Sequence, residues 1–308
     1  MAVGSPSALG RQRWTTEKER RVHLPRSMRS PVTPLPDTAR QLPEFAKPPV
    51  VEVACSIQFE PIKELHAGLL GLLWEEYRER YPRVEEQAPL PPTREQFTEA
   101  PPRFGFTMQG TFPMPRVWFL TEDEQRLVQV QRDYFIVNWR KIDTGAAYPR
   151  YPALRETLVD ELEVFQQFLS DEKLAPIRTV QAELTYVNHI EARESDGSRK
   201  ALSRIIRIWA GDKAVGKLPE FEEASAQAHY IMRDGEKPIG RLHITVEPQR
   251  FVKDKTPLYG LTLVARGAPA TPDVDGAVSF LDRGHEAIVE GFTAITTDEM
   301  HKTWERQR

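Results

Sequence analysis

The sequence predicts an α+β fold made of two similar halves. Residues 51–59 and 180–187 alternate between apolar and polar side chains, which is the pattern of a half-buried strand. Each stretch precedes short segments rich in Val, Phe, Trp and other strand-forming residues, and then a long segment with helical apolar spacing. The order strand, helix, antiparallel strands, helix therefore occurs twice.

Composition limits the class of protein. The chain has 308 residues, 40% of them hydrophobic, and a formal net charge of −3, so it can bury a core and is neither fibrous nor disordered throughout. The single cysteine, Cys55, excludes an internal disulfide and multi-cysteine zinc sites, and it favours a reducing cytoplasm. No apolar run of about 18 residues and no signal-peptide core occurs, so we expect a cytoplasmic protein with no membrane partner.

The first 41 residues predict a disordered basic arm. Residues 1–40 hold eight basic and three acidic side chains and no periodic apolar run, and Pro25, Pro31, Pro34 and Pro36 interrupt them. Such an arm could contact nucleic acid or an acidic partner. The alternative is an over-extended start, with Met28 as the initiator. The rest of the chain is then expected to form two units, 42–175 and 176–308, or one continuous domain.

In the first unit, strand 51–59 is followed by Pro61 and by leucines at helical spacing up to Tyr81-Pro82. A proline-rich stretch over 87–103 predicts an irregular connection. Residues 116–120, 126–131 and 134–140 predict an antiparallel meander, and 154–169 a long amphipathic helix.

In the second unit, strand 180–187 precedes a weaker helical patch over 202–209. Strands are predicted at 225–232, 241–247 and 258–266, with a hairpin turn at Asp234-Gly235. Thr271-Pro272 predicts the start of a long helix through 295, and 296–299 predicts a capping box before a short last helix. The layout resembles a duplicated TATA-binding-protein-like or helix-grip arrangement.

Several motifs that carry chemistry are missing. The sequence has no G-x-x-x-x-G-K-[ST] phosphate loop, no G-x-G-x-x-G after a strand, no G-x-S-x-G elbow and no H-E-x-x-H pair. NTPases, dinucleotide enzymes, hydrolases with that elbow and zincins therefore lose support, and the sequence leaves any cofactor unknown.

The polar face of the second-half strands offers the first candidate site. It presents Glu183, His189, His229 and His243, together with Glu247 and Arg266. A hairpin symmetric about residue 236 would place His229 directly opposite His243, where two imidazoles could share a metal or exchange protons. The alternative is a pair of solvated or hydrogen-bonded strand residues.

The polar face of the first-half strands offers a second candidate. It presents one guanidinium and four side-chain amides: Gln58, Gln129, Gln131, Asn138 and Arg140. These groups suit hydrogen-bonded recognition of a peptide, nucleotide or base edge, although ordinary polar alternation explains them as well.

Two further residues stand out singly. His285 lies on the apolar seam of the last long helix with Asp282 three residues earlier, which suggests either a catalytic pair or a core histidine satisfied by a carboxylate. Cys55 is on the inward face of its strand and is expected to be an inert buried thiol.

Several segments together resemble a sporadically distributed bacterial protein family of uncharacterised function. They are the LPEF-x-x-PPVVEV start at residues 42–53, 127–131 leading to Asn138-Trp139-Arg140, 183–190, and an ending with His285, Phe292, Thr296 and Trp304. The resemblance covers residues 42–306 and names no catalytic residue. Patchy distribution implies an accessory role, for example in a conflict or defence system.

These observations favour a cytoplasmic binding or interaction module that recognises a protein or small ligand on an open sheet face, and they favour an enzyme less. Two alternatives are kept. One is a metal-assisted hydrolase that uses His229 and His243, and the other is a nucleic-acid binder led by the basic arm.

Overall fold

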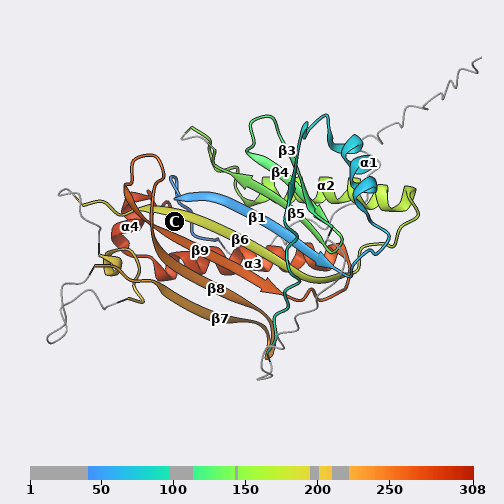
Figure 1. Cartoon of the computed structure of the whole chain (residues 1–308). Coiled ribbons are helices and arrows are strands. Elements are labelled where there is room, and N and C mark those ends of the chain that lie inside the picture. Colours follow the sequence, from blue (N-terminus) through green and yellow to red (C-terminus); the bar gives the residue numbers. More distant parts are fainter. Residues whose placement is uncertain (1–40, 98–113, 143–144, 195–200, 210–221) are drawn as a thin grey trace, which may run out of the picture. The chain divides into compact units, whose positions relative to one another are not determined.

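The computed structural model describes residues 41–97, 114–142, 145–194, 201–209 and 222–308, all within one compact unit, Leu35–Arg308. The predicted basic arm, residues 1–40, lies outside the described residues. Within these ranges the chain forms a nine-stranded antiparallel sheet and four α-helices, so the predicted α+β class is confirmed (Figure 1).

The first half of the chain supplies five strands. All four predicted ones are present, and a fifth, β2, lies between the end of the predicted helix at Tyr81-Pro82 and the connection expected to be irregular. The strands are β1 (Val50–Phe59), β2 (Arg83–Gln87), β3 (Arg116–Leu120), β4 (Arg126–Gln131) and β5 (Tyr134–Arg140). Every β2 side chain remains at least partly exposed, which explains why no apolar alternation marked this strand.

The second half supplies the other four strands, each longer than predicted. They are β6 (Thr179–Glu191), β7 (Ala226–Asp234), β8 (Lys237–Arg250) and β9 (Pro257–Gly267). The order across the sheet is β2-β3-β4-β5-β1-β6-β9-β8-β7, and β1 pairs antiparallel with β6 at its centre. Both halves therefore contribute to one continuous sheet (Figure 1).

The helices depart from prediction mainly at their starts. They are α1 (Ala67–Tyr77), α2 (Tyr151–Asp171), α3 (Val274–Ile295) and α4 (Asp298–Thr303). Thr271-Pro272 does not begin α3, because Asp273 is the N-cap and its side chain accepts from Gly276 N. Of the helical patch expected over 202–209, a single 3₁₀ turn forms, η2 (Leu202–Arg204). Among the described residues, no helix combines the length and apolar character that crossing a bilayer requires.

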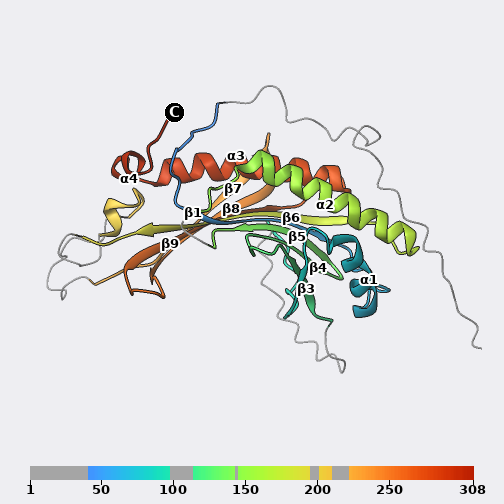
Figure 2. The ribbon, with the colours of Figure 1, turned by 90° about the horizontal axis from the view of Figure 1, so that it is seen from above.

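The two long helices, α2 and α3, lie along the same face of the sheet (Figure 2). Between them and the strands is the main core, to which Cys55 belongs, with 1% of its surface exposed. Burial, followed by the nearby charge of Asp282, raises the pKa of Cys55 to about 12, and the thiol is buried as expected. Tyr151 and Arg155 of α2 both hydrogen-bond Asp282 of α3, which joins the two helices.

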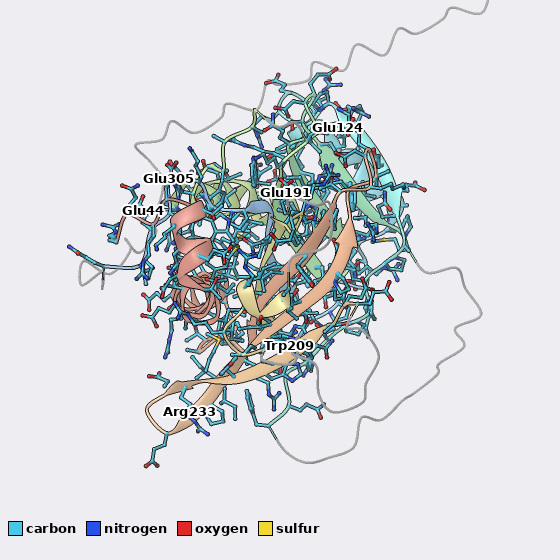
Figure 3. All side chains as sticks on the ribbon, turned by 90° about the vertical axis from the view of Figure 1, so that its left-hand side faces the viewer. Glu44, Glu124, Glu191, Trp209, Arg233 and Glu305 are labelled. Atoms are coloured by element: carbon cyan, nitrogen blue, oxygen red, sulfur yellow. The ribbon has the colours of Figure 1, made fainter. Side chains whose placement is uncertain are left out.

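The two ends of the described chain are joined. Phe45 and Arg306 form an isolated β-bridge, and Ala46 N donates to Glu305 O, so Glu44 and Glu305 lie near each other in Figure 3. The Phe45 ring packs edge-on against Phe292 of α3, with ring centroids 5.5 Å apart. The N-terminal segment is thereby held beside α3 and α4.

A pair of glycines allows α3 to approach the sheet. Gly240 of β8 and Gly267 of β9 are register partners, and a Cβ at Gly267 would lie 2.2 Å from Ile239 O and 2.6 Å from the Phe280 ring. Phe280 of α3 therefore packs where any larger residue would collide.

Candidate functional site

The sheet face that α2 and α3 leave uncovered, which we call the open face, carries every predicted site residue. Strand neighbours such as Ile57, Val128 and Leu184 point into the core, so the alternate positions point the other way. The registers place on the open face Gln58, Gln129, Gln131, Asn138, Arg140, Glu183, His189, His229 and His243. Their proposed ligand and metal roles stay predictions.

These residues form separate groups. In the first half of the sheet, Gln129 Nε2 donates to Asn138 Oδ1 (2.6 Å), and Asn138 Nδ2 donates to Glu52 Oε1 (2.7 Å). This chain of side chains crosses β4, β5 and β1. Gln129 and Asn138 are both buried, so their amides are fixed rather than freely solvated.

A segment that follows β2 crosses the open face. Residues 88–97, which we call the strap, contact β4, β5, β1 and β6 in turn. Over β4, Leu90 N donates to Gln131 Oε1 (2.9 Å) and Gln131 Nε2 donates back to Leu90 O (3.1 Å). Over β5, Tyr134 Oη donates to Pro91 O (3.2 Å). Both contacts recognise the main chain of the strap.

The central strands continue the same pattern. Gln58 Oε1 of β1 accepts from Thr93 N (3.3 Å). Gln181 of β6 binds two peptide groups, because its Nε2 donates to Thr93 O and its Oε1 accepts from Glu95 N, both at 2.8 Å. Gln58, Gln131 and Gln181 are each at most 4% exposed, so the strap satisfies amides that little water reaches.

Glu95 anchors the strap to the second half of the sheet. Its carboxylate binds Arg241 and His243 of β8, with 2.6 Å from His243 Nε2 to Glu95 Oε1, and lies 3.7 Å from Arg266 Nη1. The side chain is only 6% exposed. Burial raises the pKa of Glu95, but hydrogen bonds from His243 and Arg241 and their charges outweigh burial, so its pKa is lowered.

The predicted pairing of His229 with His243 is confirmed by the β7–β8 register, and their ring centroids are 4.7 Å apart. His243 Nε2, however, is engaged by Glu95. Within the described ranges, no group of three or more His, Cys, Asp or Glu is arranged to hold a metal ion. A metal shared by His229 and His243 therefore stays a prediction, and the described residues offer no third protein ligand for it.

Next to the hydrogen-bonded side chains of Gln129, Asn138 and Glu52 lies a group around Trp118 that includes buried polar atoms without a hydrogen-bond partner among the described residues. Trp118 of β3 faces Gln129 and lies beneath the guanidinium groups of Arg116 and Arg140, at 5.5 and 5.4 Å from the ring centroid. Its register with Gln129 places Trp118 on the open face. Among the described residues, four buried atoms here have no hydrogen-bond partner: Arg116 Nε, Trp118 Nε1, Gln129 Oε1 and Arg140 Nε.

The remaining predicted residues lie at the margins of these groups. Glu183 forms an ion pair with Arg266, which connects it to the Glu95 anchor. His189 is half-buried beside Phe251 at the other end of β6, where burial lowers its pKa. The structure therefore does not bring His189 together with the other candidates.

The pair of His285 and Asp282 does not form. Asp282 is bound by Arg155 and Tyr151, whereas His285 Nδ1 bonds Tyr186 Oη at 3.1 Å. The i, i+3 spacing allowed a contact on one helix face, but α2 supplies stronger partners to the carboxylate.

Four residues of the site were missing from the sequence-based set: Tyr134, Gln181, Arg241 and Glu95. The first three have the strand parity of the predicted residues, so alternation could have identified them. Glu95 lies in a proline-rich connection, where nothing periodic indicates its position.

No protein-family model and no curated protein matches the chain.

Proposed function

We propose that the chain is a protein-binding module whose open face holds an extended, proline-containing segment with an acidic residue. The observation that carries this proposal is the strap, a ten-residue segment of that kind whose main chain is bound by side-chain amides from three strands. The strap is then an internal ligand that a partner segment of the same chemistry replaces.

The contacts to the strap suit recognition of many sequences. Gln131 and Gln181 each bind a donor and an acceptor of the main chain, which any extended peptide presents. Pro89, Pro91 and Pro92 favour an extended conformation before binding, which lowers the entropy lost when the segment is ordered.

Specificity would come from the anchor. Arg241, His243 and Arg266 surround one carboxylate, and the Arg241 guanidinium also lies 4.6 Å from the centroid of the Phe97 ring. The preferred segment would therefore carry an acidic residue followed two positions later by an aromatic one.

Replacement of the strap requires that its release leave the core intact. Apart from the Glu95 side chain, which is 6% exposed, the strap is accessible to solvent, and six of its ten residues are exposed. Its attachment rests on hydrogen bonds and one anchored carboxylate, which water and a competing peptide can replace. Segments with so little buried apolar surface open at low free-energy cost.

The test uses a fluorescent peptide with the sequence of residues 88–97 and the full chain carrying Glu95→Gln. The substitution weakens the internal strap, so this variant should bind the peptide in an anisotropy titration. The wild-type chain should bind at least about tenfold more weakly, because its own strap competes at an effective concentration in the millimolar range.

Three controls accompany the titration. A peptide with Gln in place of Glu95 should lose most of its affinity, and adding Gln181→Ala to the receptor should do the same. Adding His229→Ala, on the same face but outside the strap contacts, should change little. A folded Glu95→Gln chain that leaves the peptide unbound at about 1 mM would falsify the proposal.

Both halves of the chain contribute strands to the open face. We infer that the two halves are an internal repeat of the TATA-binding-protein-like or helix-grip kind. The sheet order supports this inference. Reading outward from the central β1–β6 pair, both sides continue with the last, middle and first strand of a meander, and a long helix follows each meander. Failure of any single rotation to superpose β1, β3–β5 and α2 on β6, β7–β9 and α3 would overturn the inference.

The other functions stay predictions. A metal-assisted hydrolase needs ligands beyond His229 and His243, and unchanged metal content in His229→Ala plus His243→Ala would exclude it. Nucleic-acid binding by residues 1–40 should disappear, with its salt dependence, when the arm is deleted. A conflict or defence role and a cytoplasmic location stay expectations from the sequence.

A further inference from the structure

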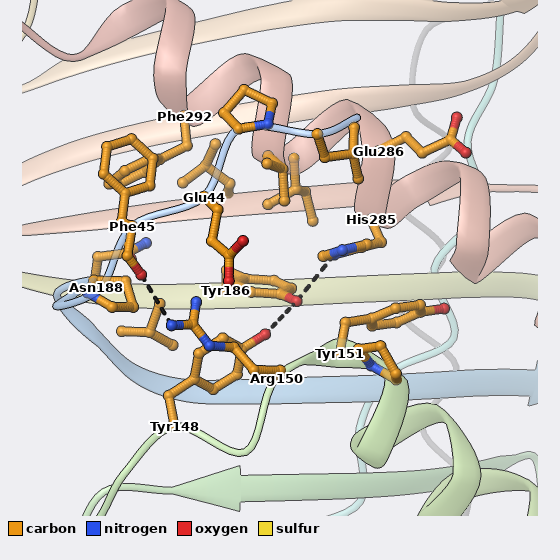
Figure 4. A pocket seen from close by; sticks show the side chains of 18 of the residues that line it. Glu44, Phe45, Tyr148, Arg150, Tyr151, Tyr186, Asn188, His285, Glu286 and Phe292 are labelled. Carbon is orange, nitrogen blue, oxygen red and sulfur yellow. Dashed lines mark hydrogen bonds between the residues drawn. The ribbon is translucent and has the colours of Figure 1, made fainter. Parts of the chain in front are cut away.

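A cavity lies on the helix-covered side of the sheet. This cavity of about 800 Å³ opens between the N-terminal segment, the residues before α2, strand β6 and helix α3 (Figure 4). Its volume is in the range of small-molecule sites. Its walls are mainly apolar and aromatic, and include Phe45, Tyr148, Tyr186 and Phe292.

One wall carries a chain of hydrogen bonds. Tyr148 Oη lies 2.7 Å from Tyr186 Oη, which lies 3.1 Å from His285 Nδ1 (Figure 4). Burial raises the pKa of both tyrosines and lowers that of His285 to about 4, so all three groups are neutral at pH 7. The Tyr151 ring stacks on the imidazole at 4.2 Å and fixes its plane.

The ends of this chain are complementary. If Tyr148 donates to Tyr186 and Tyr186 donates to His285, Nε2–H remains a donor and the Tyr148 oxygen an acceptor. If the chain runs the other way, Tyr148 becomes the donor and Nε2 the acceptor. Either polarity presents one donor and one acceptor to a hydroxyl, carbonyl or amide in the cavity.

Arg150 supplies the charge. Its Nη2 donates to Phe45 O (2.9 Å), and its guanidinium lies 5.6 Å from the Tyr148 ring centroid. No acidic residue of the described structure forms an ion pair with it. Of the carboxylates that line the cavity, Glu44 pairs with Arg308, Asp282 pairs with Arg155, and Glu286 is exposed to water.

The backbone at Arg150 is strained. Its φ of 70° and ψ of 154° lie in a region that is almost restricted to glycine. Pro149 directly precedes this residue, and α2 begins directly after it at Tyr151, so Arg150 is the N-cap of the helix. Strain of this kind is concentrated at binding and catalytic sites. Two described cations, Arg150 and Arg308, line the cavity, and Arg308 is paired with Glu44, so Arg150 is the one without an ion pair.

We propose that this cavity binds a small organic anion with an aromatic or apolar body, its acidic group on Arg150 and a hydroxyl or carbonyl on the Tyr148–Tyr186–His285 chain. The aromatic walls accommodate the body of the ligand. The site is independent of the open face, since no residue is shared between the cavity and the strap contacts.

Calorimetric titration of the full chain with 4-hydroxybenzoate and its neutral isostere 4-hydroxybenzamide tests the proposal. The acid should bind the wild-type chain about tenfold more tightly than the amide, because only the acid can form a charge-assisted pair with Arg150. Arg150→Gly should abolish that difference. Glycine suits the φ at this position, so the variant should fold, which its thermal denaturation verifies.

Two more variants separate the groups of the cavity. Tyr148→Phe should weaken both compounds, because it removes one end of the hydrogen-bonded chain. Glu286→Gln, the matched control at the mouth, should retain or slightly increase affinity for the acid. Equal affinity of the wild-type chain for acid and amide, or no binding of either at about 10 mM, would overturn the proposal.

Discussion

The two faces of the sheet are built by opposite chemistry. Under α2 and α3, the strands present Ile57, Phe135 and Leu184, none of them measurably exposed. On the open face the strands present amides and charges, and the strap covers part of them with hydrogen bonds. The difference shows that the apolar core lies on the helix-covered face, whereas the open face holds its covering segment with polar contacts. The proposed binding and release of a segment concerns the open face alone.

The largest expected effect is on the helix-covered face. Phe165 of α2 is fully buried and stacks on Phe135 at 5.3 Å. Phe165→Ala should lower the free energy of unfolding by about 3–5 kcal/mol, since it removes buried apolar area and leaves a cavity. Chemical denaturation measures the loss.

The open face provides the contrast for that experiment. Gln129→Ala removes a buried side chain of β4 and should cost about 1 kcal/mol, the typical value of one hydrogen bond. Equal losses for Phe165→Ala and Gln129→Ala would contradict a division of the sheet into a structural face and a binding face.

The second effect depends on pH. Burial lowers the pKa of His285 to about 4 in the folded chain, whereas the unfolded chain takes up this proton near pH 6.5. Stability from this residue is therefore complete above pH 6.5 and falls by about 3 kcal/mol as pH decreases to 4. Denaturation curves at several pH values should show this slope, and His285→Gln should flatten it.

The anchor on the open face responds at lower pH. The lowered pKa of Glu95 means that its contribution is complete above about pH 4.5 and is lost as pH falls through the lowered value. If denaturation curves showed the helix-covered face losing stability only over the same pH range as the strap, the two faces would not be independent, and the comparison between them would fail.

A pair of glycines gives the third prediction. Gly267→Ala should destabilise by about 1–3 kcal/mol, because the new methyl group collides with Ile239 O and Phe280. Gly71→Ala in α1, with no atom within 4 Å of its Cβ, should instead stabilise by about 0.5–1 kcal/mol through helix propensity. Melting temperatures that move in the same direction would argue against close packing of α3 on β8 and β9.

The smallest expected change in global stability comes from the strap. Glu95→Gln should leave chemical denaturation within about 1 kcal/mol of the wild type, since the strap buries little apolar surface. The amide protons of Thr93 and Glu95, which bond Gln58 and Gln181, should exchange about tenfold faster. Unchanged exchange would indicate that the strap is a permanent part of the fold.

Much of the strand pattern was predictable. The three meander segments 116–120, 126–131 and 134–140 match β3, β4 and β5 in full. Each segment is rich in strand-forming residues and is bounded by residues that favour turns. The register of His229 with His243 was also predictable, since a short hairpin constrains its own pairing, even with a bulge beside Arg233. The exposed strand β2 and the reduced helix at 202–209 lacked such local signals.

The sites were less accessible to prediction. Strand parity placed the predicted residues on one face, because successive side chains of a strand alternate. It could not show that residues 88–97 lie over them, since a proline-rich connection has no period and its path depends on distant partners. The cavity is a similar case, because Phe45, Tyr148 and His285 are separated by about a hundred residues and more.

By itself, the sequence determined the fold class, the positions of most strands, the inward direction of Cys55 and the polar character of one sheet face, because all of these depend on local periodicity. The tertiary structure alone decided the central pairing of β1 with β6, the partners of Glu95 and the cavity beside Arg150. It also decided that Asp282 pairs with Arg155 and not with His285. These features arise from contacts between segments far apart in the chain, and local spacing carries no record of such contacts.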